Sequence, residues 1–294
     1  MTAPPARPAP VGDPARTGTA RLPDGRLLGW AEWGPPDGRP VVLCPGAATS
    51  RWLGCGADVV DGLGVRLVSV DRPGLGASTP APGRTLADFA TDLRALCAAR
   101  DLGRPAVVGN SQGAPFALAC AAAGVAGSLA LVSAADEVAT ADRLDPGVRD
   151  LVALTARDPA AAEEFFTGFT AAAMRELVLT GSPACDRAVY GSPAFAAAYR
   201  RALDEGFAQG ASGYARDTVL AMSRWPLDLA ALTLPCDIWY GTEDTTHSPD
   251  RGARLTTRIP GAHRHLVPDT GGALLWTHTE EILTTLLAPA ARDD

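Results

Sequence analysis

The segment AVVGNSQGAPFA, residues 106–117, decides the fold. Its apolar start predicts a buried strand, and the small residues from Ala114 onward predict a helix. Between them, Gly109-Asn110-Ser111-Gln112-Gly113 matches the pattern GxSxG. In such a strand-to-helix context the serine lies on a sharp turn, and the flanking glycines leave room for a strained backbone. We therefore expect the Ser111 hydroxyl to stand above a sheet, at a helix N-terminus that favours developing negative charge.

Apolar runs bounded by glycine or proline recur along the rest of the chain. A hairpin comes first, with residues 19–22 and 26–33 joined by the turn Pro23-Asp24-Gly25. Runs typical of strands buried on both faces lie at 41–44, 65–70, 106–108, 129–132 and 238–240. Segments whose apolar residues recur at helical spacing lie between these runs. The clearest of them follows Thr85, which together with Asp88 predicts an N-cap. The alternation predicts an α/β fold with a mostly parallel sheet flanked by helices.

The alternation stops between about residues 136 and 226, where the pattern is helical and rich in alanine. The simplest organisation is one sheet built from residues 18–135 and 227–290, with a helical insertion at 136–226. Residues 1–17 contain five prolines among the first fifteen positions and no apolar block, so we expect a disordered leader and not a signal peptide. Because no apolar run reaches the roughly 18 residues of a membrane span, we expect a cytoplasmic protein that binds no membrane.

The composition excludes several chemistries. All 26 basic residues are arginine, so pyridoxal enzymes, Schiff-base aldolases, P-loop NTPases and protein kinases, which need a lysine amine, are excluded. The net charge of −7 argues against nucleic-acid binding, because phosphates would repel such a surface. No CxxC pair is present, so we expect reduced, buried thiols and no disulfide or zinc site. The cysteines are Cys44, Cys55, Cys97, Cys120, Cys185 and Cys236.

Two further motifs accompany the GxSxG pentapeptide: Pro45-Gly46-Ala47-Ala48-Thr49-Ser50-Arg51 and Asp71-Arg72-Pro73-Gly74-Leu75-Gly76-Ala77-Ser78. Together the three make the chain, from about residue 19 to 287, resemble the α/β-hydrolases, in particular their proline-iminopeptidase-like and esterase branches. The resemblance implies an eight-stranded, mostly parallel sheet, a helical lid at 136–226, and Ser111 as nucleophile. It also implies an oxyanion hole made by the backbone N–H groups of Ala47 and Gln112, and a structural role for residues 71–78.

The resemblance also points to a catalytic acid. Gly241-Thr242-Glu243-Asp244 follows a strand in the position of the family's acid motif, so Asp244 is expected to orient and stabilise a histidine. Glu243 is the less favoured neighbour. Asp136, after the strand at 129–132, is the alternative that some relatives use.

The family's histidine, by contrast, has no counterpart. It is expected six residues before the residue that opens the last helix. Counting back from His278 gives Gly272, and a one-residue slip gives Ala273. Neither side chain can accept a proton, and loss of the base in a serine protease lowers turnover about a million-fold. The sequence therefore predicts a vacant histidine position at Gly272 or Ala273.

The chain has only four histidines with which to replace it. His278 is expected at the start of the last helix, out of hydrogen-bond reach of the serine. His263 and His265 share one face of a strand and are expected to be a simple strand-end pair, with no third ligand for a metal. His247 is the only histidine near the acid in sequence, and we expect it at the surface.

The helical insertion bounds the substrate. Its cluster Phe165, Phe166, Phe169 and Met174 is expected either to wall an apolar pocket over Ser111 or to bury one helix on its neighbour. A mid-sized apolar ester, lactone or thioester is the expected small-molecule substrate. No cofactor is implied, because Gly74-Leu75-Gly76 lacks the remaining features of a phosphate-binding loop.

Three interpretations of the vacant position stay open. The chain is a hydrolase whose histidine was substituted or lost, a lyase or cyclase that uses the oxyanion hole without a base, or a ligand-binding homologue without turnover. The sequence does not indicate the oligomeric state.

Overall fold

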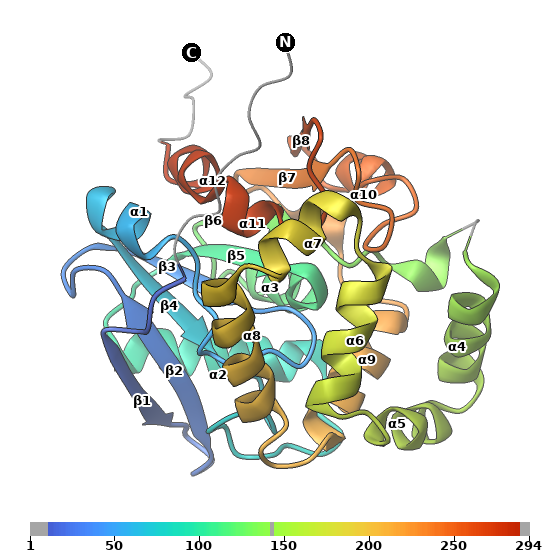
Figure 1. Cartoon of the computed structure of the whole chain (residues 1–294). Coiled ribbons are helices and arrows are strands. Elements are labelled where there is room, and N and C mark those ends of the chain that lie inside the picture. The colour runs from blue at the N-terminus through green and yellow to red at the C-terminus, as the bar shows by residue number, and fades with distance from the viewer. Residues whose placement is uncertain (1–10, 142–143, 289–294) are drawn as a thin grey trace.

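The computed structural model describes residues 11–141 and 144–288, and these form a single eight-stranded sheet with helices on both faces (Figure 1). The strand order is β1-β2-β4-β3-β5-β6-β7-β8. Pairings β1–β2 and β2–β4 are antiparallel and the other five are parallel, so the prediction of a mostly parallel sheet is confirmed. The strands are β1 (Arg16–Arg21), β2 (Leu27–Trp33), β3 (Arg39–Cys44), β4 (Val65–Val70), β5 (Ala106–Asn110), β6 (Ser128–Val132), β7 (Cys236–Gly241) and β8 (His263–Val267).

The first strand begins earlier than its apolar pattern predicts. Arg16 pairs with Glu32 in the β1–β2 ladder, and its Nε donates to the Glu32 carboxylate at 3.0 Å. A polar cross-strand pair therefore extends the hairpin beyond the hydrophobic run. The predicted leader at 1–17 thus overlaps β1 at its end, and its residues 1–10 lie outside the described part of the chain.

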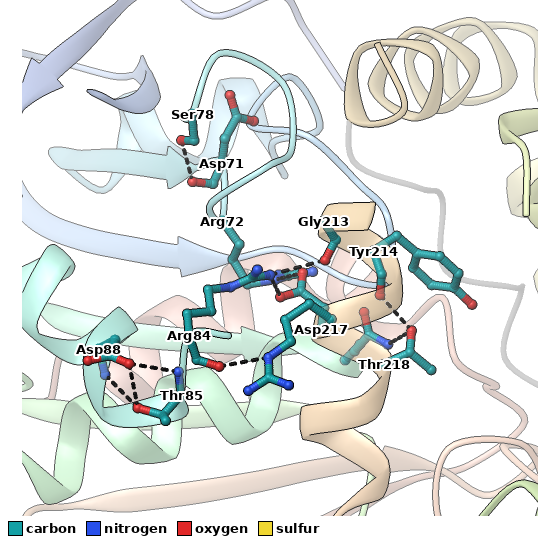
Figure 2. A network of polar contacts seen from close by, with 12 residues as sticks. Asp71, Arg72, Ser78, Arg84, Thr85, Asp88, Gly213, Tyr214, Asp217 and Thr218 are labelled. Atoms are coloured by element: carbon teal, nitrogen blue, oxygen red, sulfur yellow. Dashed lines mark hydrogen bonds and ion pairs between the residues drawn. The ribbon is translucent and has the colours of Figure 1, made fainter. Parts of the chain in front are cut away.

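Helices cover both faces of the sheet, and each face receives helices from both halves of the chain. The apolar side chains of α2 (Leu86–Ala99), α3 (Ala114–Ala122) and α10 (Ala253–Arg258) pack in one core. Those of α1 (Ala57–Gly62), α11 (Leu274–Thr277) and α12 (Thr279–Leu286) pack in the other. The predicted N-cap of α2 is a full capping box, in which the Thr85 hydroxyl accepts from Asp88 N and the Asp88 carboxylate accepts from Thr85 N (Figure 2).

In the described part of the chain, six α-helices separate β6 from β7, within the segment where a helical insertion is predicted. Figure 1 shows them gathered beside the sheet, with α7 next to α11. They are α4 (Pro146–Arg157), α5 (Pro159–Thr167), α6 (Ala171–Gly181), α7 (Ala184–Tyr190), α8 (Pro193–Gly206) and α9 (Ser212–Met222). Within residues 11–141 and 144–288, no helix combines the length and the apolar character needed to cross a bilayer.

All six cysteines are free, and five of them are buried. Burial raises the pKa of the Cys44, Cys55 and Cys236 thiols to about 12. The prediction of buried thiols holds for these five, whereas Cys185 in α7 is partly exposed.

Candidate active site

Ser111 occupies the sharp turn that the sequence predicts. It follows β5, opens the short 3₁₀ turn Ser111–Gly113 before α3, and has a φ of 50°. A Cβ on Gly113 would lie 2.0 Å from the Cys44 carbonyl oxygen, and a Cβ on Gly109 would lie 2.7 Å from the Ala117 Cβ. Only glycine fits at either position, because no real Cβ makes contacts that short. The two glycines of the motif thus hold a strained serine at the end of β5.

The loop after β3 brings the predicted donor Ala47 beside this serine. A Cβ on the preceding Gly46 would lie 3.4 Å from the Ser111 Cβ, so the two backbones are in close contact. Arg72 fixes the loop, because its Nη1 donates to Pro45 O (2.5 Å) and its Nη2 to Gly46 O (3.0 Å). In a trans peptide the C=O and the N–H point in opposite directions, so the Ala47 N–H points away from Arg72.

The second predicted donor, Gln112, is tied to helix α9. Its side-chain Nε2 donates to the Thr218 hydroxyl at 3.0 Å, and that hydroxyl donates to Tyr214 O at 2.9 Å. Among the described residues, no group accepts a hydrogen bond from the backbone N–H of Gln112 or of Ala47. Both amides are therefore free to bind an oxyanion.

A buried ion cluster connects α9 with the motif at residues 71–78. Asp217 of α9 accepts from Arg72 Nε at 2.6 Å and from Arg84, and Figure 2 shows the three side chains converging. Asp71 turns the other way: it accepts from Arg51 N and from Ala77 N within its own loop. The prediction of a structural role for this motif is confirmed.

The predicted acid Asp244 lies directly after β7 and is almost fully buried. Its carboxylate accepts from Thr246 N (3.2 Å) and from His247 N (3.3 Å), and both of its oxygens lie 3.0 Å from His247 Nδ1. Burial alone would raise the pKa of this carboxyl, but the charge of His247 and these hydrogen bonds hold it below the ordinary value. Asp244 thus faces a histidine three residues away on its own loop.

The alternative acids have other surroundings. Asp136 accepts from Ser248 Oγ (2.9 Å) and from Glu137 N (2.7 Å), and contacts no histidine ring. Its pKa is raised, chiefly by burial. Glu243 is exposed.

His247 is not a surface residue, so that expectation is wrong. Its side chain is 21% exposed, and its ring fills the space beside Gly272. A Cβ on Gly272 would lie 2.6 Å from the ring Cε1 and 3.0 Å from Nδ1. The position that the sequence predicts to be vacant thus carries no imidazole of its own, but an imidazole from another loop lies against it. The only signal in the sequence was the spacing of three residues from Asp244.

A carboxylate from α7 holds the loop that contains Gly272. Asp186 is buried and accepts from Gly272 N (2.6 Å) and from Ala273 N (3.0 Å). Burial raises its pKa, and the two backbone donors offset part of that rise. Sequence reasoning missed Asp186, because its partners are backbone amides 86 and 87 residues away and leave no pattern in the sequence.

Burial and the neighbouring charges have opposite effects on the pKa of His247. Burial lowers the pKa of the imidazole, but the charges of Asp244 and Asp186 and the hydrogen bond to Asp244 outweigh it, so the pKa of His247 is raised. The two carboxylates therefore favour an imidazolium at this position.

The other three histidines lie elsewhere. His278 precedes α12 and lines a separate hollow between α8 and α12. His263 is exposed on β8, and His265 stacks on Trp239 and pairs with Asp237. Among residues 11–141 and 144–288, no group of three or more potential ligands could hold a metal ion.

A cavity of about 390 Å³ lies at the end of β5, beside the loops after β3, β7 and β8. Ser111, Ala47, His247 and Gly272 all line it. No hydrogen bond links Ser111 to His247 among the contacts of the described residues. Asn110 also lines the cavity, and most of the remaining lining residues are apolar or carry a hydroxyl group. Those with larger side chains come largely from the six helices and include Leu53, Val148, Leu177, Val178, Tyr190, Phe195, Tyr199 and Trp276.

The predicted pocket residues Phe165, Phe166 and Phe169 are not among those that line the cavity, and this expectation is corrected. Phe165 is 54% exposed, Phe166 is buried in the core, and Phe166 and Phe169 both pack on Tyr214 of α9. They fix α5 to α9. The aromatic wall of the cavity comes instead from α7, α8 and α11, which sequence reasoning did not single out.

Comparison with known proteins agrees with this architecture. The sequence model described as alpha/beta hydrolase fold matches residues 39–279. A stretch of 104 residues is 35% identical to the non-heme chloroperoxidase of Streptomyces lividans, and the match spans 33% of this chain and 36% of that protein. Two solved structures are similar at the level of the fold. The enol-lactonase of Burkholderia xenovorans has a TM-score of 0.68 and 20% sequence identity, and the match covers 92% of this chain and 98% of that one. An esterase from a Rhodococcus species has a TM-score of 0.65 and 21% identity, and the match covers 92% of this chain and 98% of that one.

Proposed function

Because the chain belongs to the alpha/beta hydrolase fold family, we propose that it hydrolyses a carboxylic ester or lactone with Ser111 as nucleophile. The observation that carries the proposal is the strained backbone of Ser111, which has a φ of 50° and lines a cavity. The N–H groups of Ala47, which also lines the cavity, and of the adjacent Gln112 have no hydrogen-bond partner among the described residues. Strain of this kind persists where the surrounding structure imposes it, and it concentrates at sites of reaction. The esterase and lactonase names of structurally similar proteins support the same reaction class.

The oxyanion hole is the second support. When Ser111 Oγ attacks a carbonyl carbon, negative charge develops on the carbonyl oxygen, and the N–H groups of Ala47 and Gln112 would stabilise it. Arg72 holds the first amide through Gly46, and Thr218 holds the side chain next to the second. Preorganised donors of this kind need no rearrangement during the reaction.

The cavity limits the substrate. Its volume of about 390 Å³ lies near the lower end of the range for small-molecule sites, about 300–1,000 Å³. Leu177, Val178, Phe195 and Trp276 line it, and none of its lining residues in the described part of the chain is Asp, Glu or Arg. A small to mid-sized apolar acyl group or lactone ring therefore suits the site better than a charged peptide terminus.

The test is mass spectrometry of the intact protein after brief incubation with p-nitrophenyl butyrate, together with release of p-nitrophenol. We expect turnover and a butyryl adduct on Ser111 when the reaction is quenched early. Ser111→Ala should abolish both. Ester hydrolysis that is unchanged in Ser111→Ala, or a wild-type protein that neither turns over nor acylates, would contradict the proposal.

A further inference from the structure

We infer that His247 is the general base that activates Ser111, and that it acts from the loop after β7, three residues beyond its acid, and not from the loop after β8. This inference rests on the proposed hydrolysis at Ser111. It accounts for the serine, the ring and the glycine that line the cavity, and for the acid that lies behind the ring.

The contact with Asp244 sets which ring nitrogen is free. Nδ1 lies 3.0 Å from both carboxylate oxygens, so in the neutral ring the proton belongs on Nδ1 and is donated to Asp244. Nε2 then has an unshared pair and can accept a proton. This is the division of roles that a serine, histidine and aspartate need: the acid orients the ring through one nitrogen, and the other nitrogen faces the nucleophile.

The loop of His247 is held in place from the side of β6. Ser248 Oγ donates to Asp136 at 2.9 Å, and Asp136 N donates to His247 O at 3.1 Å. Asp136 therefore serves as a positioning residue that anchors the chain at His247 and at the residue that follows it. The hydrogen bond from Ser248 accounts for the buried carboxylate of Asp136, so this carboxylate needs no role as the catalytic acid.

The loop after β8 makes room for the ring. Gly272 has no Cβ, and its N–H is bound by Asp186 from α7. Gly271 is equally confined, because a Cβ there would lie 2.4 Å from Asp186 Oδ2. Two consecutive glycines thus pack between the Asp186 carboxylate and the His247 ring. A side chain in the place of the family's histidine would collide with the ring that replaces it.

The proton balance closes with water as the only co-reactant. The Ser111 Oγ–carbon bond forms as the Oγ proton moves to His247 Nε2 and the carbonyl π electrons move onto oxygen. The C–OR bond then breaks, and His247 returns the proton to the leaving alkoxide. Water attacks the acyl-enzyme, its proton passes to Nε2, and the carbon–Oγ bond breaks as Ser111 regains a proton.

The test compares His247→Ala, His247→Gln and Ser111→Ala in hydrolysis of p-nitrophenyl butyrate, with His263→Ala as the matched control on exposed β8. We expect each of the first three to lower kcat by up to about a million-fold, and the Ser111→Ala/His247→Ala double variant to be no worse than either single variant. His263→Ala should keep wild-type kcat. Glutamine can donate to Asp244 but cannot take up a proton, so it separates a base from a structural role.

Each outcome has a distinct meaning. An inactive Ser111→Ala beside a fully active His247→Ala would overturn the inference and leave the hydrolase proposal intact. Recovery of activity in His247→Gln would also overturn it, because a polar side chain of similar shape would then suffice. An active Ser111→Ala would instead contradict the proposed function itself. Thermal unfolding by circular dichroism checks that the glutamine variant, which retains a donor to Asp244, is folded when its kcat is measured.

Discussion

Gly272→Ala adds one methyl group beside the His247 ring, and we expect it to lower kcat about 100-fold. The new Cβ would lie 2.6 Å from Cε1, whereas ordinary contact begins at 3.4 Å, so the ring must retreat by about 0.8 Å. A misplacement of about 1 Å in a catalytic group can cost about 100-fold in rate, or about 2.7 kcal/mol in activation free energy. The φ of Gly272 lies outside the left-handed region, so the backbone accepts alanine.

The assay is steady-state hydrolysis of p-nitrophenyl butyrate, with Gly62→Ala as the matched control. Gly62 ends α1, has no atom within 4 Å of its added Cβ, and also lies outside the left-handed region. We expect the control to keep wild-type kcat. In the His247→Ala background the space beside residue 272 is empty, so Gly272→Ala should then change the residual rate less than about threefold.

Two results would refute this reasoning. If Gly272→Ala retained wild-type kcat, contact between residue 272 and the ring would have no catalytic consequence. If it lowered the rate a further 100-fold in the His247→Ala background, the damage would act through something other than the ring, such as the bond from residue 272 N to Asp186.

Three further predictions follow from the same contacts. Asp244 and Asp186 raise the pKa of His247 above its ordinary value of 6.5, and the proposed base must be neutral to accept a proton. In a pH–rate profile, kcat/KM should therefore fall as the pH drops through a value above 6.5. An acidic limb with an apparent pKa at or below 6.5 would contradict this prediction. Asp217→Asn removes the buried carboxylate between Arg72 and Arg84 and should lower the free energy of unfolding by about 3–5 kcal/mol in urea titration; a loss under 1 kcal/mol would show the cluster to be dispensable. Native protein treated with iodoacetamide should be labelled first at Cys185, the one cysteine that is not buried, as peptide mapping will show.

Local sterics explain why the elbow could be predicted from sequence. Gly109 and Gly113 are each excluded from carrying a Cβ by neighbours close in the chain or on the next strand, and that requirement appears in the sequence as two fixed glycines. The buried strands were visible for the same reason, since a strand covered on both faces must be apolar along its whole length. These features leave their mark at the constrained residues themselves, as a glycine or an apolar run, and a single sequence records such marks.

The position of the proposed base could not be predicted, because it depends on a contact between two distant loops. The sequence shows that Gly272 lacks an imidazole and that His247 follows Asp244 by three residues. It does not show that the ring lies against Gly272, or that Asp186 of α7 binds the N–H groups of residues 272 and 273 from 86 and 87 positions away. The prediction that the phenylalanine cluster lines the pocket was wrong for a similar reason. The spacing identified an apolar face, but it did not show whether Tyr214 or the cavity would cover that face.

The position of His247 also changes what the insertion between β6 and β7 does for catalysis under our proposal. A histidine on the loop after β8 would lie one strand away from its acid on the loop after β7. Here the ring is held by the loop after β7, and the glycines beside it are held by a carboxylate of α7. Catalytic groups are defined by geometry and role and not by chain position, so the acid and the base can share one loop provided that another element confines them. Helix α7 supplies that confinement, which ties the geometry of the base to the same helices that wall the substrate cavity.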